Sequence, residues 1–69
     1  MHLEIRLNGK NINISSNTYT IQDLLNEYQL ENRIVIVEVN KEIIYKEQYS
    51  LTHLSNGDSV ELIHFVGGG

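Results

Sequence analysis

The chain of 69 residues has no cysteine, and five basic residues stand against nine acidic ones, for a net charge of −4. Without cysteine the protein has no disulfide and no thiol of its own for nucleophilic or redox chemistry. The basic residues are scattered rather than gathered on an aromatic-rich face, which argues against nucleic-acid binding by counterion release. An acidic surface instead fits a protein partner with a basic docking face.

Long hydrophobic runs are also missing. The longest aliphatic run covers only residues 34–37, far short of the roughly 20 residues that span a membrane. The first six residues include Glu4 and Arg6, where a signal peptide would be apolar. We therefore expect no membrane association and a cytoplasmic location.

No group of residues forms an enzyme or metal constellation. His2, His53 and His64 are far apart and lack the spacing of metal ligands. No serine lies in a nucleophile-elbow pattern, and the glycines form no phosphate-binding loop. A chain of this length buries only about 60% of its unfolded surface, which leaves little interior for a catalytic pocket. We expect a protein that is not an enzyme and that binds no metal or cofactor.

The first half of the chain predicts a hairpin and a helix. Residues 2–8 and 10–14 alternate between apolar and polar side chains, as half-buried strands do, and Asn8-Gly9 between them is a strong signal for a type I′ turn. Thr20 is a good N-cap, and Asp23 stands where a capping box needs it. We expect a helix over residues 21–29 whose apolar stripe consists of Ile21, Leu24, Leu25 and Tyr28.

The second half predicts three further strands. Residues 33–39 are mostly β-branched and predict an interior strand, and Asn40-Lys41 turns the chain into a short strand over residues 43–45. Residues 46–54 form an irregular segment with a possible 3₁₀ turn. Its expected anchors are Tyr49, Leu51 and Leu54. A turn over residues 55–58 leads to the last strand, over residues 59–66.

These elements predict an α+β fold, a mixed sheet of four to five strands with one helix packed on one face. Polar residues that must face water set the side-chain parity. The helix side then receives Leu3, Ile5, Leu7, Val35, Val37, Val39, Val60 and Leu62. The other face keeps Ile34, Ile36, Ile63 and Phe65, an apolar patch of the kind that marks interaction sites. Alternatively, the irregular segment or a second copy of the chain covers this patch.

Three glycines, Gly67, Gly68 and Gly69, end the sequence. We expect a folded domain over residues 1–66 and a flexible tail over residues 67–69. Glycine lets a backbone approach another surface closely. Since the sequence shows no enzyme or metal constellation, the carboxylate of Gly69 is the only reactive feature left. The alternative is a frayed terminus without a role.

The sequence resembles the ThiS family of thiamine-biosynthesis sulfur carriers, which have the ubiquitin-like β-grasp fold. The matching stretches are Leu7-Asn8-Gly9-Lys10, residues 20–25, residues 34–44, Lys46 with Tyr49, and Gly57-Asp58 through Gly68-Gly69. Two positions depart from the family pattern. Gly67 replaces a larger residue, which loosens the tail, and Tyr49 replaces a tryptophan, which concerns packing.

This resemblance implies a reaction for the tail. A ThiF-like adenylyltransferase adenylates the Gly69 carboxylate with ATP, sulfur from a cysteine desulfurase converts it to a thiocarboxylate, and a ThiG-like thiazole synthase takes the sulfur. Gly67 and Gly68 then thread the slot of the partner. We expect the residues that contact the partner enzymes to be Ile34, Ile36, Ile63, Phe65 and Val66. Two alternatives stay open: the related small subunit of molybdopterin synthase, and a noncovalent β-grasp binding module with an idle tail.

Overall fold

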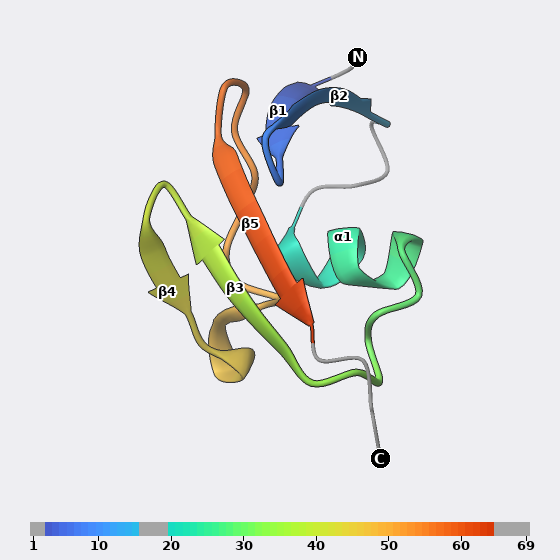
Figure 1. Cartoon of the computed structure of the whole chain (residues 1–69). Coiled ribbons are helices and arrows are strands. Elements are labelled where there is room, and N and C mark those ends of the chain that lie inside the picture. The colour runs from blue at the N-terminus through green and yellow to red at the C-terminus, as the bar shows by residue number, and fades with distance from the viewer. Residues whose placement is uncertain (1–2, 16–19, 65–69) are drawn as a thin grey trace.

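The computed structural model describes residues 3–15 and 20–64. Its elements in chain order are β1 (Leu3–Leu7), β2 (Lys10–Ile14), α1 (Ile21–Glu27), β3 (Val35–Val39), β4 (Glu42–Ile44), the 3₁₀ turn η1 (Lys46–Gln48) and β5 (Ser59–His64). The strands form one sheet in the order β2-β1-β5-β3-β4 (Figure 1). β1 and β5 run parallel and the other neighbours antiparallel. The predicted mixed sheet with one helix is confirmed.

Both hairpins use two-residue turns with left-handed backbone. Asn8 and Gly9 have φ of 50° and 85°, as a type I′ turn requires, and the turn joins the paired residues Leu7 and Lys10. Asn40 and Lys41 repeat this geometry, with φ of 52° and 72°. Because the second turn ends at Lys41, pairing resumes at Glu42, and β4 covers residues 42–44 instead of the predicted 43–45.

Helix α1 begins as predicted but ends two residues early. The Asp23 backbone N–H donates to Thr20 Oγ1 (3.1 Å), and the Thr20 N–H donates to Asp23 Oδ2 (3.0 Å), which completes the capping box. At the other end Gln29 adopts φ of 59°, and the Leu30 N–H donates to the Leu25 carbonyl (2.8 Å). This is a Schellman motif with glutamine in the position that glycine usually holds.

The early end of α1 changes the environment of Tyr28. As the C-cap residue, Tyr28 lies beyond the apolar stripe and is 45% exposed. Its predicted packing against the sheet is therefore wrong. The other three residues of the stripe are buried as predicted.

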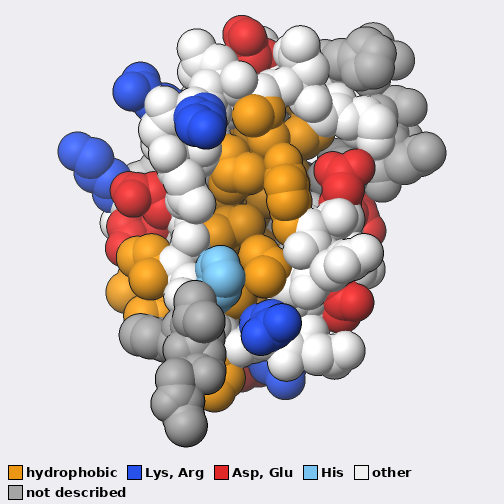
Figure 2. Space-filling view, turned by 45° about the vertical axis from the view of Figure 1, so that its right-hand side comes forward, with side chains coloured by type: hydrophobic (Ala, Val, Ile, Leu, Met, Phe, Trp, Pro, Cys, Tyr) orange, Lys and Arg blue, Asp and Glu red, His pale blue; other side chains and the backbone are white. Residues whose placement is uncertain are grey.

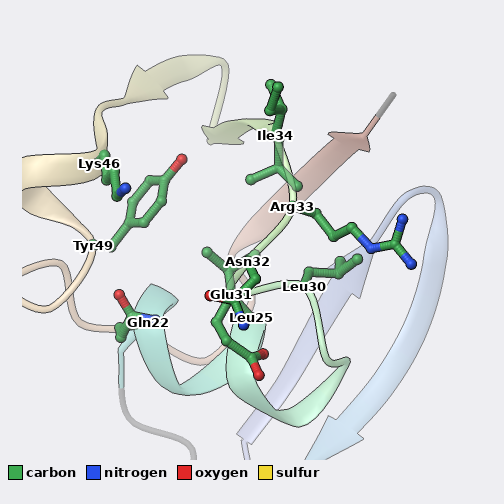
Figure 3. Close-up of a pocket in the computed structure, with 10 residues that line it drawn as sticks. Gln22, Leu25, Leu30, Glu31, Asn32, Arg33, Ile34, Lys46 and Tyr49 are labelled. Atoms are coloured by element: carbon green, nitrogen blue, oxygen red, sulfur yellow. The ribbon is translucent and has the colours of Figure 1, made fainter. Parts of the chain in front are cut away.

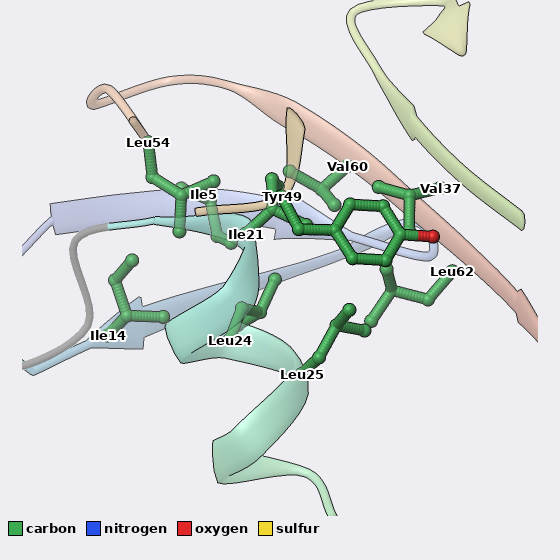
Figure 4. Packing of buried hydrophobic residues seen from close by; sticks show 10 residues of the cluster. All are labelled: Ile5, Ile14, Ile21, Leu24, Leu25, Val37, Tyr49, Leu54, Val60 and Leu62. Atoms are coloured by element: carbon green, nitrogen blue, oxygen red, sulfur yellow. The ribbon is translucent and has the colours of Figure 1, made fainter. Parts of the chain in front are cut away.

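The core lies between α1 and one face of the sheet (Figure 4). Its buried members are Ile5, Ile14, Ile21, Leu24, Leu25, Val37, Tyr49, Leu54, Val60 and Leu62. The remaining residues predicted for this face are partly buried: Leu3, Leu7, Val35 and Val39. A helix of seven residues is only about 10 Å long, too short to cover five strands. Figure 2 accordingly shows a strip of hydrophobic side chains that stays open on one side of the molecule.

The segment that follows β4 closes one end of the core. Tyr49 and Leu54 are buried, as predicted, but Leu51 is 73% exposed, so its predicted role as an anchor is wrong. The backbone here turns in helical fashion, with the Leu51 N–H donating to the Gln48 carbonyl. Residues two apart then point to opposite sides, and Tyr49 takes the inward position.

Candidate functional site

Strand β5 carries the chain from the middle of the sheet toward the glycine tail. It lies between β1 and β3, and its last described residue, His64, pairs with Val35. The predicted site residues Phe65, Val66, Gly67, Gly68 and Gly69 follow directly and lie outside the described residues. The structure therefore places the base of the tail, while the roles assigned to those five residues stay predictions.

Beside this exit, the open face of the sheet carries an apolar pair. Ile36 on β3 and Ile63 on β5 are directly opposite each other. They are 37% and 45% exposed, whereas the neighbouring residues Val37 and Leu62 are buried in the core. The prediction that Ile36 and Ile63 face away from the helix is confirmed. In the described part of the chain the irregular segment does not bury them.

Ile34 belongs to a different environment. It is 76% exposed, but it precedes β3 and has no strand partner among the described residues. It lines a hollow of about 420 Å³ together with the core residues Leu25 and Tyr49. Ile34 is therefore exposed as predicted without joining the row that Ile36 and Ile63 form.

That hollow lies between the end of α1, the start of β3 and the segment after β4 (Figure 3). Lys46, Gln22 and Asn32 also line it. Figure 3 shows the Arg33 guanidinium directed away from Tyr49 and the Glu31 carboxylate turned outward from the hollow. The described residues that line the hollow form no recognisable arrangement of acid, base and nucleophile.

Among the described residues, Tyr49 is the titratable group with the clearest shift in pKa. Burial raises the pKa of the Tyr49 hydroxyl above its ordinary value of 10.0, and the negative charge of Glu47 adds to this effect. A raised pKa keeps the hydroxyl neutral, which suits a packing residue rather than a base. Among the described residues, no group of three or more histidine, cysteine, aspartate or glutamate side chains could hold a metal ion.

Two turn asparagines hold β5 from both sides, a role that the sequence did not reveal. Asn8 accepts from the Leu62 N–H through Oδ1 (2.8 Å) and donates from Nδ2 to the Leu62 carbonyl (3.2 Å). Across the sheet, Asn40 Oδ1 accepts from the Ser59 N–H (3.0 Å). Each side-chain amide makes hydrogen bonds that a backbone peptide group would otherwise make, at a point where the neighbouring strand has turned away from β5. The sequence gives no separate signal for this role. Asn8 and Asn40 are already explained by the positive φ angles of their turns.

Comparisons with known proteins agree with this geometry. The profile of the ThiS family matches residues 5–69. The chain is 58% identical to the sulfur carrier protein ThiS of Bacillus subtilis (strain 168) over 94% of this chain and 98% of that protein. The crystal structure of a thiamine biosynthesis protein (ThiS) from Geobacter metallireducens superimposes with a TM-score of 0.80 at 29% identity, covering 97% of this chain and 100% of that one.

A further similarity links the chain to an enzyme. It is 36% identical to a segment of the thiazole synthase of Paramagnetospirillum magneticum, with 97% of this chain matching 20% of that protein. Within residues 3–15 and 20–64, no helix has the length and hydrophobicity to cross a membrane. The ThiS family profile covers residues 5–69, including the three glycines, and the chain therefore belongs to the ThiS family, the small sulfur carriers of thiamine biosynthesis.

Proposed function

We propose that the chain carries sulfur as a thiocarboxylate on Gly69 and delivers it for formation of the thiazole ring. The observation that carries this proposal is the extent of the family match, which runs through residue 69 and so includes the three terminal glycines. The structure supports it, because β5 leads the chain out of the sheet beside two exposed isoleucines. A partner enzyme that binds this face is therefore close to the point where the tail begins.

The proposed chemistry explains why a carrier needs a partner enzyme. A carboxylate is a poor electrophile, since its leaving group would be an oxide. Attack of a Gly69 carboxylate oxygen on the α-phosphate of ATP releases pyrophosphate and gives an acyl-adenylate. The persulfide that a cysteine desulfurase forms then attacks the carbonyl carbon, and AMP leaves with the bonding electrons. Thiols supply the two electrons that cleave the S–S bond of the resulting acyl disulfide, which releases the thiocarboxylate. ATP is consumed by the partner, and the carrier itself binds no cofactor.

Three partners follow from this sequence of steps. A ThiF-like adenylyltransferase supplies the adenylate, and a cysteine desulfurase supplies the sulfur. A thiazole synthase receives it, which fits the thiazole synthases that contain a segment similar to this chain. We place the reaction in the cytoplasm, where ATP is available to the partner enzyme.

Gly67 and Gly68 have a steric role in this proposal. An active site that surrounds the carboxylate of another protein must admit the preceding backbone through a narrow slot. Residues without Cβ pass where any side chain would meet the wall. Ile36 and Ile63 supply apolar contact at the base of the tail, and Phe65 and Val66, the next residues in the sequence, add to it.

The test is the intact mass of the protein after incubation with its adenylyltransferase, ATP and a sulfur source. We expect a gain that equals one exchange of oxygen for sulfur. A variant lacking Gly68 and Gly69 is the control, and it should fold normally but show no gain. An unchanged mass of the full chain, with a partner that thiolates another carrier in parallel, would contradict the proposal.

A further inference from the structure

The open face of the sheet carries an acidic pair next to its apolar pair. Glu38 on β3 and Glu61 on β5 are directly opposite each other, and Ile43 on β4 is opposite Glu38. Side chains two residues apart on a strand point to the same face. The two glutamates and Ile43 therefore form a row across three strands, adjacent to the row of Ile36 and Ile63.

This acidic pair places two carboxylates at directly opposed positions of paired strands. Like charges directly opposite on paired strands destabilise a sheet. In the described part of the chain neither carboxylate forms an ion pair, and the basic residue on the neighbouring strand, Arg6, is opposite Ser59, one row further along. The chain as a whole is also acidic, with a net charge of −4. A cation placed between Glu38 and Glu61 would remove the repulsion.

The apolar side chains around the pair define the rest of the surface. Ile36, Ile43 and Ile63 are 37%, 52% and 45% exposed. Three exposed isoleucines on adjacent strands are unusual for a surface that meets only water. Together with the two glutamates they form what we call the docking face: Ile36, Glu38, Ile43, Glu61 and Ile63.

We propose that the docking face binds the thiazole synthase through an arginine or lysine that enters between Glu38 and Glu61, with apolar side chains of the synthase on the three isoleucines. This inference rests on the proposed function and names the contact by which one partner recognises the carrier. A guanidinium fits best, because it can donate to both carboxylates at once. The synthase is the partner to which we assign the contact, since some thiazole synthases contain a segment similar to this chain and must accommodate it within one protein.

The experiment measures two quantities on each variant: affinity for the thiazole synthase of the same organism, across a salt titration, and the denaturant midpoint of the free carrier. The variants are Glu38→Gln, Glu61→Gln and the double substitution. Glu42→Gln is the matched control, because Glu42 is an exposed glutamate of the same sheet that is opposite Val39 and so has the parity of the helix side.

We expect the double variant to bind the synthase on the order of tenfold more weakly at low ionic strength and to lose much of the salt dependence. The denaturant midpoint of the same variant should rise, because the repulsion is gone. Glu42→Gln should change neither quantity. Opposite movement of affinity and stability separates a binding role from a merely structural one.

Unchanged affinity in the double variant would overturn the proposal, as would a lowered denaturant midpoint. Normal binding to the synthase combined with weakened binding to the adenylyltransferase would overturn the choice of partner. None of these results bears on whether the wild-type chain gains sulfur. The docking face and the proposed function can therefore fail independently.

Discussion

The two faces of the sheet are built from the same kind of side chain and serve different ends. Val37 is fully buried while Ile36 beside it is 37% exposed, and Leu62 is 6% exposed while Ile63 is 45% exposed. Helix α1 makes the difference, since it packs on one face only. On the inner face aliphatic residues hold the fold together. On the outer face the same chemistry adds little to stability, and it remains available for a partner.

The largest expected effect is on the inner face. Leu24 is fully buried between α1 and the sheet, and Leu24→Ala should lower the free energy of unfolding by about 3 kcal/mol. Ile63→Ala on the outer face should lower it by no more than about 1 kcal/mol. Urea denaturation of both variants checks the contrast. Equal losses would show that the outer face is as tightly packed as the core.

Charge on the outer face should act on binding instead. Ile63→Glu should weaken binding to a partner enzyme by tenfold or more, about 1.4 kcal/mol, because it places a charge in an apolar contact. Its effect on the free energy of unfolding should stay within about 1 kcal/mol. Ile63→Thr, which keeps the β-branch, serves as the control. Unfolding of Ile63→Glu in isolation would assign Ile63 to the core.

Strand β5 belongs to both faces, and Asn8 tests how firmly it is held. Asn8→Gly keeps the positive φ of the turn but removes two hydrogen bonds to Leu62. We expect a loss of about 1 kcal/mol in the free energy of unfolding and faster amide hydrogen exchange at Leu62. Exchange at Ile12, on the far strand of the hairpin, should change less. Unaltered protection at Leu62 would mean that the asparagine amide adds nothing to the strand.

The smallest effect concerns Tyr49 and pH. Because its pKa is raised in the folded state above the ordinary 10.0, the unfolded chain releases this proton first. The free energy of unfolding should therefore hold steady below the ordinary value and fall as pH rises through the raised one. Urea titrations at about pH 8 and about pH 11 bracket this range. Tyr49→Phe should reduce the alkaline loss, and an equal loss in both proteins would remove Tyr49 as its source.

Sequence reasoning succeeded where one local signal determines the structure. Alternating side chains placed the strands and their buried faces, and Asn8-Gly9 placed the first turn. Thr20 and Asp23 placed the start of the helix. These signals act within a few residues, so they can be recognised without knowledge of the fold.

The misses arise where tertiary contacts decide. Gln29 ends α1 in a left-handed conformation, which a glycine at this position would have indicated in the sequence. The position of Tyr28 depends on where the helix ends. Leu51 is outside because Tyr49 takes the inward position in the same turn. The bonds from Asn8 to Leu62 join residues 54 positions apart, a separation at which no pattern of neighbours gives a signal. The opposition of Glu38 and Glu61 likewise needed the register of β3 against β5.

The central claim is that the carboxylate of Gly69 is the functional group. The most direct test is the intact mass of the protein purified from sulfur-replete cells, followed by fragmentation to locate any change. We predict a fraction of molecules heavier by one exchange of oxygen for sulfur, with the change confined to Gly69. Sulfur attached elsewhere in the chain, or a full-length protein without it in cells that form the thiazole ring, would contradict the account.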